Sequence, residues 1–245
     1  MKPFVNPVEM NIPIDPAAAP VFTKREDIDD SAFIAESIVT GSEKDYILSF
    51  LEETSWQPVS ITGMQGNYEP GDPIGSWRAS SFQEAYAKAL FARISKFIPQ
   101  VKHCDDSANT DWDGHEKWIP VGVNPLLRFI KYTDGGYLVP HYDAPYVASD
   151  EERTLASVVI YLDNDATMTG GAVQFLNDPQ SNIPVHLRNL DDLTEESKAE
   201  DVIVSLHPKP GSALVFDHRI LHESQRISGP GQKTIIRTDI MYRKG

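Results

Sequence analysis

The feature that most constrains the fold is a series of short apolar stretches after about residue 120. They are rich in β-branched and aromatic residues, and turn-forming glycine, proline, asparagine and aspartate separate them, which is typical of strands. Short strands at this density predict an antiparallel sandwich or barrel. The expected strands are LLRFIKY, YLVPHYD, LASVVIYL, GAVQFL, DVIVSL, SALVF and TIIRTDIMY.

The rest of the chain is expected to support this core as part of one globular domain. Its 245 residues, 40% of them hydrophobic, suffice to bury a full core. Residues 1–40 are rich in proline and acids and predict an extended arm, whereas residues 41–119 predict a support region of helices and strands packed on the core at 120–245. Within the core, the acidic stretch 177–201 is long for a connector and predicts either a solvated insertion or a lid.

Two helices are expected in the support region. The first starts near Ser42, where SEKD resembles a capping box, and continues through apolar residues at helical spacing. The second has Ser81 and Glu84 in capping-box spacing and is expected to end at Pro99. Its expected buried stripe consists of Phe82, Tyr86, Leu90, Ile94 and Phe97.

Composition narrows the partners and the kinds of site. A formal net charge of −14 repels phosphate backbones and anionic lipid, so neither nucleic acid nor a membrane surface is expected as a partner. The first residues lack the apolar block of a signal peptide, and no apolar run approaches the roughly 20 residues that span a bilayer, so a cytoplasmic location is expected. The single cysteine, Cys104, excludes a disulfide framework within the chain and a cysteine-based metal site.

A candidate metal site lies in GGYLVPHYDAPY. On a strand, His141 and Asp143 point to the same face while Tyr142 points away. A third ligand, His222, is available in PKPGSALVFDHRILHES, where a turn and an apolar strand precede it. Two histidines and one carboxylate on one face of a metal leave the other face open, as expected for non-haem iron(II).

These histidines also have less specific interpretations. A His-x-Asp triplet by itself is most often a surface pair. His218 and His222 are four residues apart, a spacing that on a helix suggests a zinc pair, but the residues before them, SALVF, favour a strand.

Five segments in order make the assignment more specific. The stretch that contains RFIKYTDGGYLVPHYD, SVVIYLDND, GGAVQFL, PKPGSALVFDHRILHES and GQKTIIRTDIMYR resembles the prolyl-4-hydroxylase-like branch of the iron(II)- and 2-oxoglutarate-dependent dioxygenases. The resemblance covers about residues 120–245. It implies a double-stranded β-helix of jelly-roll type, braced by N-terminal helices. His141, Asp143 and His222 fall on the metal ligands of this family.

The resemblance also implies a binding site for 2-oxoglutarate. In this family a Lys or Arg after the second histidine binds the distal carboxylate, and Lys233 stands at that position. Arg237 is the alternative, because it faces the same side of the strand and can form a bidentate contact with a carboxylate. Tyr132 and Tyr161 resemble tyrosines that line this pocket in relatives, and either can instead be a core aromatic. Three further residues are candidate substrate contacts, namely Arg128, Arg78 and Trp77.

The resemblance implies an oxygenase with the chemistry of this family. The expected cofactors are iron(II), 2-oxoglutarate and O2, with ascorbate as a stimulant, and the expected products include succinate and carbon dioxide. The presence of Asp143, which related halogenases replace by a small residue, favours hydroxylation of an unactivated C–H bond or another oxidative outcome such as desaturation. The expected substrate is a small amino-acid-like or carboxylate-bearing molecule, and the runner-up is a prolyl residue of a peptide or protein. Two further hypotheses are a cupin-like metal enzyme that uses no 2-oxoglutarate and a non-catalytic binding protein on the same scaffold.

Overall fold

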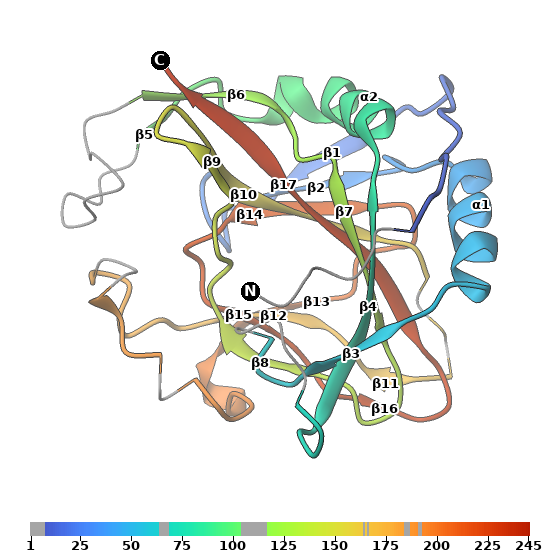
Figure 1. Ribbon diagram of the computed structural model, residues 1–245. Helices are drawn as coiled ribbons and strands as arrows, with labels where there is room; N and C mark the ends of the chain where they lie inside the picture. The colour runs from blue at the N-terminus through green and yellow to red at the C-terminus, as the bar shows by residue number, and fades with distance from the viewer. Residues whose placement is uncertain are drawn as a thin grey trace.

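A large antiparallel sheet is the frame of the molecule (Figure 1). The computed structural model describes residues 8–63, 69–103, 117–163, 165, 167–183, 187–190 and 193–245. Within these ranges the sheet has 11 strands, of which eight follow the order β1-β2-β14-β10-β17-β7-β4-β3, while β5 and β6 extend it beside β17 and β9 pairs with β10. Its strands are β1 Val21–Lys24, β2 Phe33–Glu36, β3 Gln57–Ser60, β4 Ile74–Phe82, β5 Lys102–His103, β6 Lys117–Val123, β7 Leu126–Tyr132, β9 Val147–Ser149, β10 Glu152–Tyr161, β14 Ala213–Asp217 and β17 Lys233–Lys244.

A smaller sheet lies opposite the large one and closes the jelly roll. Its order is β13-β12-β15-β8, and a short ribbon of β11 and β16 lies beside it. In Figure 1 this sheet occupies the lower part of the molecule. These strands are β8 Leu138–His141, β11 Thr169–Gly170, β12 Val173–Leu176, β13 Val202–Leu206, β15 His222–Ser224 and β16 Ile227–Ser228. The predicted fold class, a double-stranded β-helix braced by helices, is confirmed, and each of the seven expected stretches contains a strand.

Two apolar clusters cover the two faces of the large sheet, which explains why β10 and β17 are buried along nearly their whole length. One cluster packs the outer face against the helices through residues such as Phe129, Ile160 and Ile236. The other fills the space between the sheets through residues such as Ile130, Val159 and Phe175. Side chains alternate along a strand, so Lys233, Ile235, Arg237 and Asp239 of β17 share the face that looks into the barrel.

The two helices, α1 (Gly41–Glu52) and α2 (Glu84–Ile94), pack on the outer face, and Figure 1 shows them at the right and the top. The expected capping boxes were wrong in detail. Thr40 caps α1, with Glu43 as its reciprocal partner. Ser81 belongs to strand β4, and α2 begins after Gln83, which makes no side-chain cap.

The expected stripe of α2 was too long. Tyr86, Leu90 and Ile94 are buried as expected, whereas Phe82 on β4 is 56% exposed and Phe97 is 37% exposed. The helix ends earlier than expected, because a turn of 3-10 helix at Ser95–Phe97 follows it. No helix in the described part of the chain is long and apolar enough to cross a membrane.

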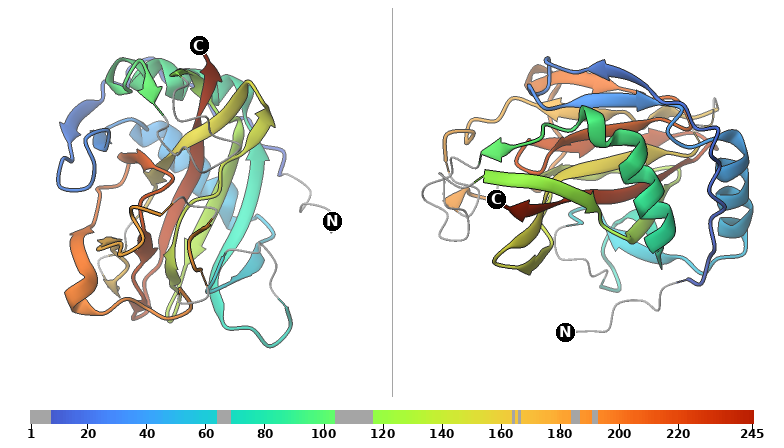
Figure 2. Two further views of the ribbon diagram at one scale, coloured as in Figure 1. Left: turned by 90° about the vertical axis from the view of Figure 1, so that its left-hand side faces the viewer. Right: turned by 90° about the horizontal axis from the view of Figure 1, so that it is seen from above.

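The N-terminal segment is partly integrated into the large sheet. β1 pairs with β2, and β2 pairs with β14. The right panel of Figure 2 shows these two blue strands beside the orange β14. Residues 21–36 therefore extend the sheet that carries the inner face of the barrel.

The acidic stretch 177–201 packs against the small sheet. Leu190 and Leu193 contact a cluster of Tyr142, Leu176 and Leu221. The Arg188 guanidinium lies 4.5 Å from the centre of the Tyr142 ring. Residues 184–186 and 191–192 of this stretch lie outside the described residues. The contacts tie the stretch to the neighbours of His141, Asp143 and His222, and its role as a lid stays a prediction.

Candidate active site

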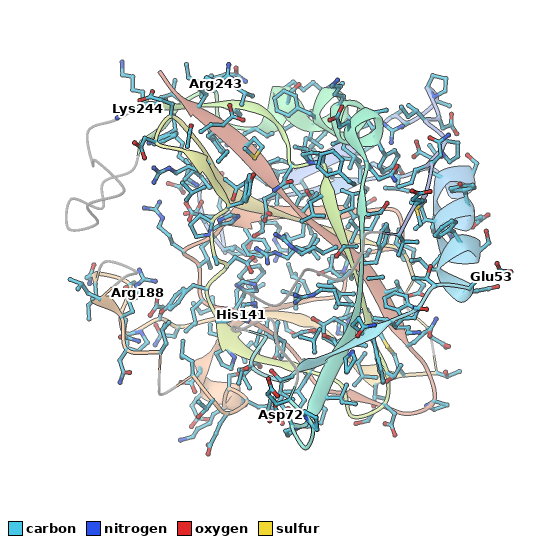
Figure 3. The ribbon with its side chains drawn as sticks, in the orientation of Figure 1. Glu53, Asp72, His141, Arg188, Arg243 and Lys244 are labelled. Atoms are coloured by element: carbon cyan, nitrogen blue, oxygen red, sulfur yellow. The ribbon has the colours of Figure 1, made fainter. Side chains whose placement is uncertain are left out.

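His141, Asp143 and His222 come together inside the barrel. One ligand atom from each lies within 4.8 Å of those of the other two, and no other such group of three occurs among the residues that the structure describes. His141 ends β8 and His222 begins β15, and these residues are directly opposite in the antiparallel pair. Figure 3 labels His141 near the end of β8. The strand register therefore brings the two histidines together.

Both imidazole rings are oriented by backbone carbonyls. The Nδ1 atom of His141 lies 2.8 Å from the carbonyl oxygen of Val139, and that of His222 lies 2.9 Å from that of Ile220. A carbonyl only accepts, so Nδ1 carries the proton and donates it, which leaves the lone pair on Nε2. Each Nε2 atom lies 3.7 Å from a carboxylate oxygen of Asp143. The free lone pairs therefore converge on one point.

The charges of the three side chains suit a divalent cation. Burial, with His222 as the next cause, lowers the pKa of His141 to about 4, and burial also lowers the pKa of His222. Burial by itself would raise the pKa of Asp143, but Arg237, His222 and His141 hold it well below its usual range. Two neutral imidazoles and one carboxylate are the protonation states that metal binding requires.

Asp143 is held by one backbone contact and by two contacts to its carboxylate. Its backbone N–H donates to the carbonyl of His218 at 3.0 Å, just beyond the end of β8. The Ser157 hydroxyl donates to Oδ2, and a terminal nitrogen of Arg237 lies 3.1 Å from Oδ1. Ser157 was missed in the sequence, although a hydroxyl in the apolar stretch LASVVIYL is a signal that could have identified it.

Lys233 is a buried cation without a carboxylate partner in the described ranges. Its side-chain nitrogen donates to the Gly171 carbonyl at 2.7 Å and to the Ser224 hydroxyl at 2.8 Å. Burial lowers its pKa to about 7. An ammonium group has three donors, so one donor and the positive charge remain available to an anion.

The two tyrosines lie on β7 and β10, the strands on either side of β17, which carries Lys233. Tyr132 is directly opposite Lys233 in the β7–β17 pair, and its ring centre is 4.5 Å from the side-chain nitrogen. Tyr161 is opposite Ile235 on the other neighbour of β17. Burial raises the pKa of each hydroxyl, so both tyrosines are protonated donors at neutral pH. Lys233, Tyr132 and Tyr161 thus form one end of the inner face.

The arginines gather at another part of the same face. Arg237 and Arg128 each contact Asp239 at 3.2 Å. Arg78 lies on the same face of β4, and Trp77, its neighbour in sequence, lies on the opposite face. The structure therefore brings Arg78, Arg128 and Arg237 together and does not bring Trp77 to them.

His218 does not join the three candidate ligands. Its Nε2 atom lies 3.3 Å from Asp239, and its ring is buried. The pair of histidines four residues apart is separated by the turn between β14 and β15, so it does not lie on a helix. The zinc-pair interpretation is therefore not supported by the local structure.

Part of the sequence matches a known family. Residues 127–238 match the family model of the 2OG-Fe(II) oxygenase superfamily. Among curated proteins, none has a sequence that matches this chain.

Three solved structures are similar to this chain at low sequence identity. A prolyl hydroxylase from Trichoplax adhaerens, in complex with a hypoxia inducible factor oxygen degradation domain peptide fragment, is 14% identical, with a TM-score of 0.50 over 86% of this chain and 84% of that chain. The viral collagen prolyl hydroxylase of Paramecium Bursaria Chlorella virus-1 is 14% identical, with a TM-score of 0.47 over 88% and 97%. HygX from Streptomyces hygroscopicus, with nickel, 2-oxoglutarate and hygromycin B bound, is 12% identical, with a TM-score of 0.49 over 87% and 82%.

Proposed function

We propose that this chain, whose residues 127–238 match the family model of the 2OG-Fe(II) oxygenase superfamily, hydroxylates an unactivated C–H bond of a small amino-acid-like or carboxylate-bearing substrate. The observation that carries the proposal is the convergence of His141, Asp143 and His222 within 4.8 Å. The nearby cations supply sites for two anions, the co-substrate and the substrate.

The three candidate ligands fit iron(II). They are two imidazoles with free Nε2 lone pairs and one carboxylate, the donor set that non-haem iron(II) enzymes use. When bound, iron(II) with O2 and 2-oxoglutarate supplies the oxidant for the C–H bond, and 2-oxoglutarate leaves as succinate and carbon dioxide. Val139 and Ile220 would keep the imidazoles in the ligating tautomer, and Ser157 would orient the carboxylate.

The side-chain nitrogen of Lys233 would bind the distal carboxylate of 2-oxoglutarate. Lys233 is 3% exposed, and burial is the cause of its lowered pKa, so a carboxylate would supply the missing countercharge. Tyr132 and Tyr161 would line the pocket and donate their hydroxyls. The aromatic rings of Phe175 and Phe216, which pack on His222, would help to exclude water from the reacting atoms.

Hydroxylation of a prolyl residue in a peptide is the second candidate. It is favoured by the fold shared with the Trichoplax adhaerens prolyl hydroxylase that binds a peptide fragment. The two candidates differ in whether the substrate needs a free carboxylate, so a matched pair of substrates can separate them.

The test is a succinate-release assay with iron(II), 2-oxoglutarate, O2 and ascorbate. The panel contains free amino acids, their amides, other small carboxylates, and proline peptides with blocked termini. We expect succinate release coupled to a hydroxylated product for a free carboxylate and not for its amide. Turnover of a blocked proline peptide, with no turnover of small carboxylates, would favour the prolyl candidate.

The binding of 2-oxoglutarate should depend on pH. A bound carboxylate favours the charged form of Lys233, so at a pH above its free-state pKa of about 7 binding must take up a proton. The affinity is therefore greatest below pH 7 and falls as the pH rises, by up to about tenfold per pH unit. Titration of the zinc-loaded protein with 2-oxoglutarate between pH 6 and 9 measures this change in affinity. Lys233→Ala should bind 2-oxoglutarate weakly, and its affinity should not fall with pH in this way. An equal fall in that variant would contradict the assignment of Lys233 to the distal carboxylate.

A further inference from the structure

Three arginines project from neighbouring strands into the same part of the barrel. Arg128 on β7 is directly opposite Arg237 on β17. Arg78 on β4 is opposite Ile130, which is two residues from Arg128 and therefore shares its face. The pairing of β4 with β7 and of β7 with β17 thus places the three side chains side by side.

The described carboxylates do not neutralise this cluster. Asp239 is shared by Arg128 and Arg237, and Arg237 also contacts Asp143. Arg78 makes no ion pair with any carboxylate that the structure describes, and its Nε atom is buried without a hydrogen-bond partner there. Two carboxylates therefore face three guanidinium groups, and one of these carboxylates belongs to the candidate metal ligands.

The position of Arg78 is electrostatically unfavourable when no anion is bound. Burial, then the charges of Arg128 and Arg237, lower its pKa to about 10, so it stays protonated at neutral pH. An unpaired buried charge costs free energy, and a ligand that neutralises it recovers that energy. The side chains of Arg128 and Arg237 are each 21% exposed, so a small ligand can reach the cluster.

We propose that Arg78, Arg128 and Arg237 bind the carboxylate of the substrate, with Arg78 as the residue that this anion neutralises. The proposal rests on the proposed function, because it assigns Lys233 to the co-substrate. Lys233 and Arg237 are four positions apart on β17, which places their Cα atoms about 13 Å apart at the rise of a strand, so the two can serve as separate anion sites. The contact between Arg237 and Asp143 puts the substrate carboxylate next to the candidate metal ligands, where it would fix which C–H bond is presented.

The experiment measures binding without turnover. The probes are trifluoroacetate and its neutral amide, trifluoroacetamide, followed by fluorine NMR with the protein loaded with zinc and saturating 2-oxoglutarate. The variants are Arg78→Met and, as a matched control, Arg243→Met, which removes an exposed arginine paired with Glu152. Thermal unfolding of the same proteins is measured in a buffer of low anion concentration.

We expect wild type and Arg243→Met to bind trifluoroacetate and not the amide, and Arg78→Met to bind it about 30-fold or more weakly. Because the half-buried Arg78 has a buried Nε atom without a partner and no described counterion, Arg78→Met should keep or raise the melting temperature. An unchanged affinity in Arg78→Met, equal binding of acid and amide, or a melting temperature lowered by several degrees would overturn the proposal. Zinc and 2-oxoglutarate binding are recorded in parallel, so the loss of these would instead count against the proposed function.

Discussion

Replacing His222 by alanine should abolish turnover and weaken metal binding by more than about a hundredfold, while the barrel stays folded. The imidazole supplies one of two nitrogen lone pairs in the candidate metal site, and changes to groups that merely orient such ligands already cost about 10- to 100-fold. The metal content after dialysis and the succinate yield measure the loss. Circular dichroism and thermal unfolding show whether the fold is retained.

The matched control is His207→Ala, which removes an exposed histidine. It should bind metal and turn over like wild type. Full activity with bound iron in His222→Ala would contradict the assignment and make His218 the next candidate. The structure favours His222, because His218 contacts Asp239 and does not lie within the group of three.

The sequence predicted the β core well because its strands carry local signals. Apolar stretches bounded by turn residues identified β7, β8, β10, β12, β13, β14 and β17. The helix caps were less predictable. Ser81 had the spacing of a capping residue, but its stretch pairs with β7 as part of β4, and this tertiary pairing overrides a local cap.

The sequence predicted which residues form the candidate metal site but not how they are arranged in space. The His-x-Asp triplet and a later histidine are visible in the sequence, whereas the opposition of His141 and His222 depends on which strands pair. The hydrogen bond from the Ser157 hydroxyl to Asp143 and the one from Lys233 to the Ser224 hydroxyl likewise depend on contacts between strands. No local pattern encodes such contacts.

The sequence suggested the cations of the inner face but not how the carboxylates around them are placed. Strand alternation in the sequence suggested Arg78 and Arg128 as substrate contacts, but a chain with 36 acidic and 22 basic residues does not show how many carboxylates surround them. Only the register of β4, β7 and β17 brings them together. The same register separates Lys233 from Arg237, two cations that the sequence offered as alternatives for one role.

Replacing Lys233 by alanine should weaken 2-oxoglutarate binding by about 30-fold to several thousand-fold, the range expected when a buried charged partner of a carboxylate is lost. Lys233 has no described carboxylate partner, so its removal leaves no buried anion unpaired and should not lower the melting temperature. Calorimetric titration of the zinc-loaded protein with 2-oxoglutarate measures the change. The control, Lys209→Ala, removes an exposed lysine paired with Glu36 and should bind like wild type.

Arg237→Ala distinguishes the two cations. Arg237 is already paired with Asp143 and Asp239, so its guanidinium has less unneutralised charge to offer a carboxylate than Lys233 has. Its loss should change 2-oxoglutarate affinity far less than the loss of Lys233. If Lys233→Ala titrates like wild type and Arg237→Ala does not, then Arg237 holds the co-substrate. In that case the arginine cluster is the 2-oxoglutarate site, and Lys233 becomes the cation left for the substrate.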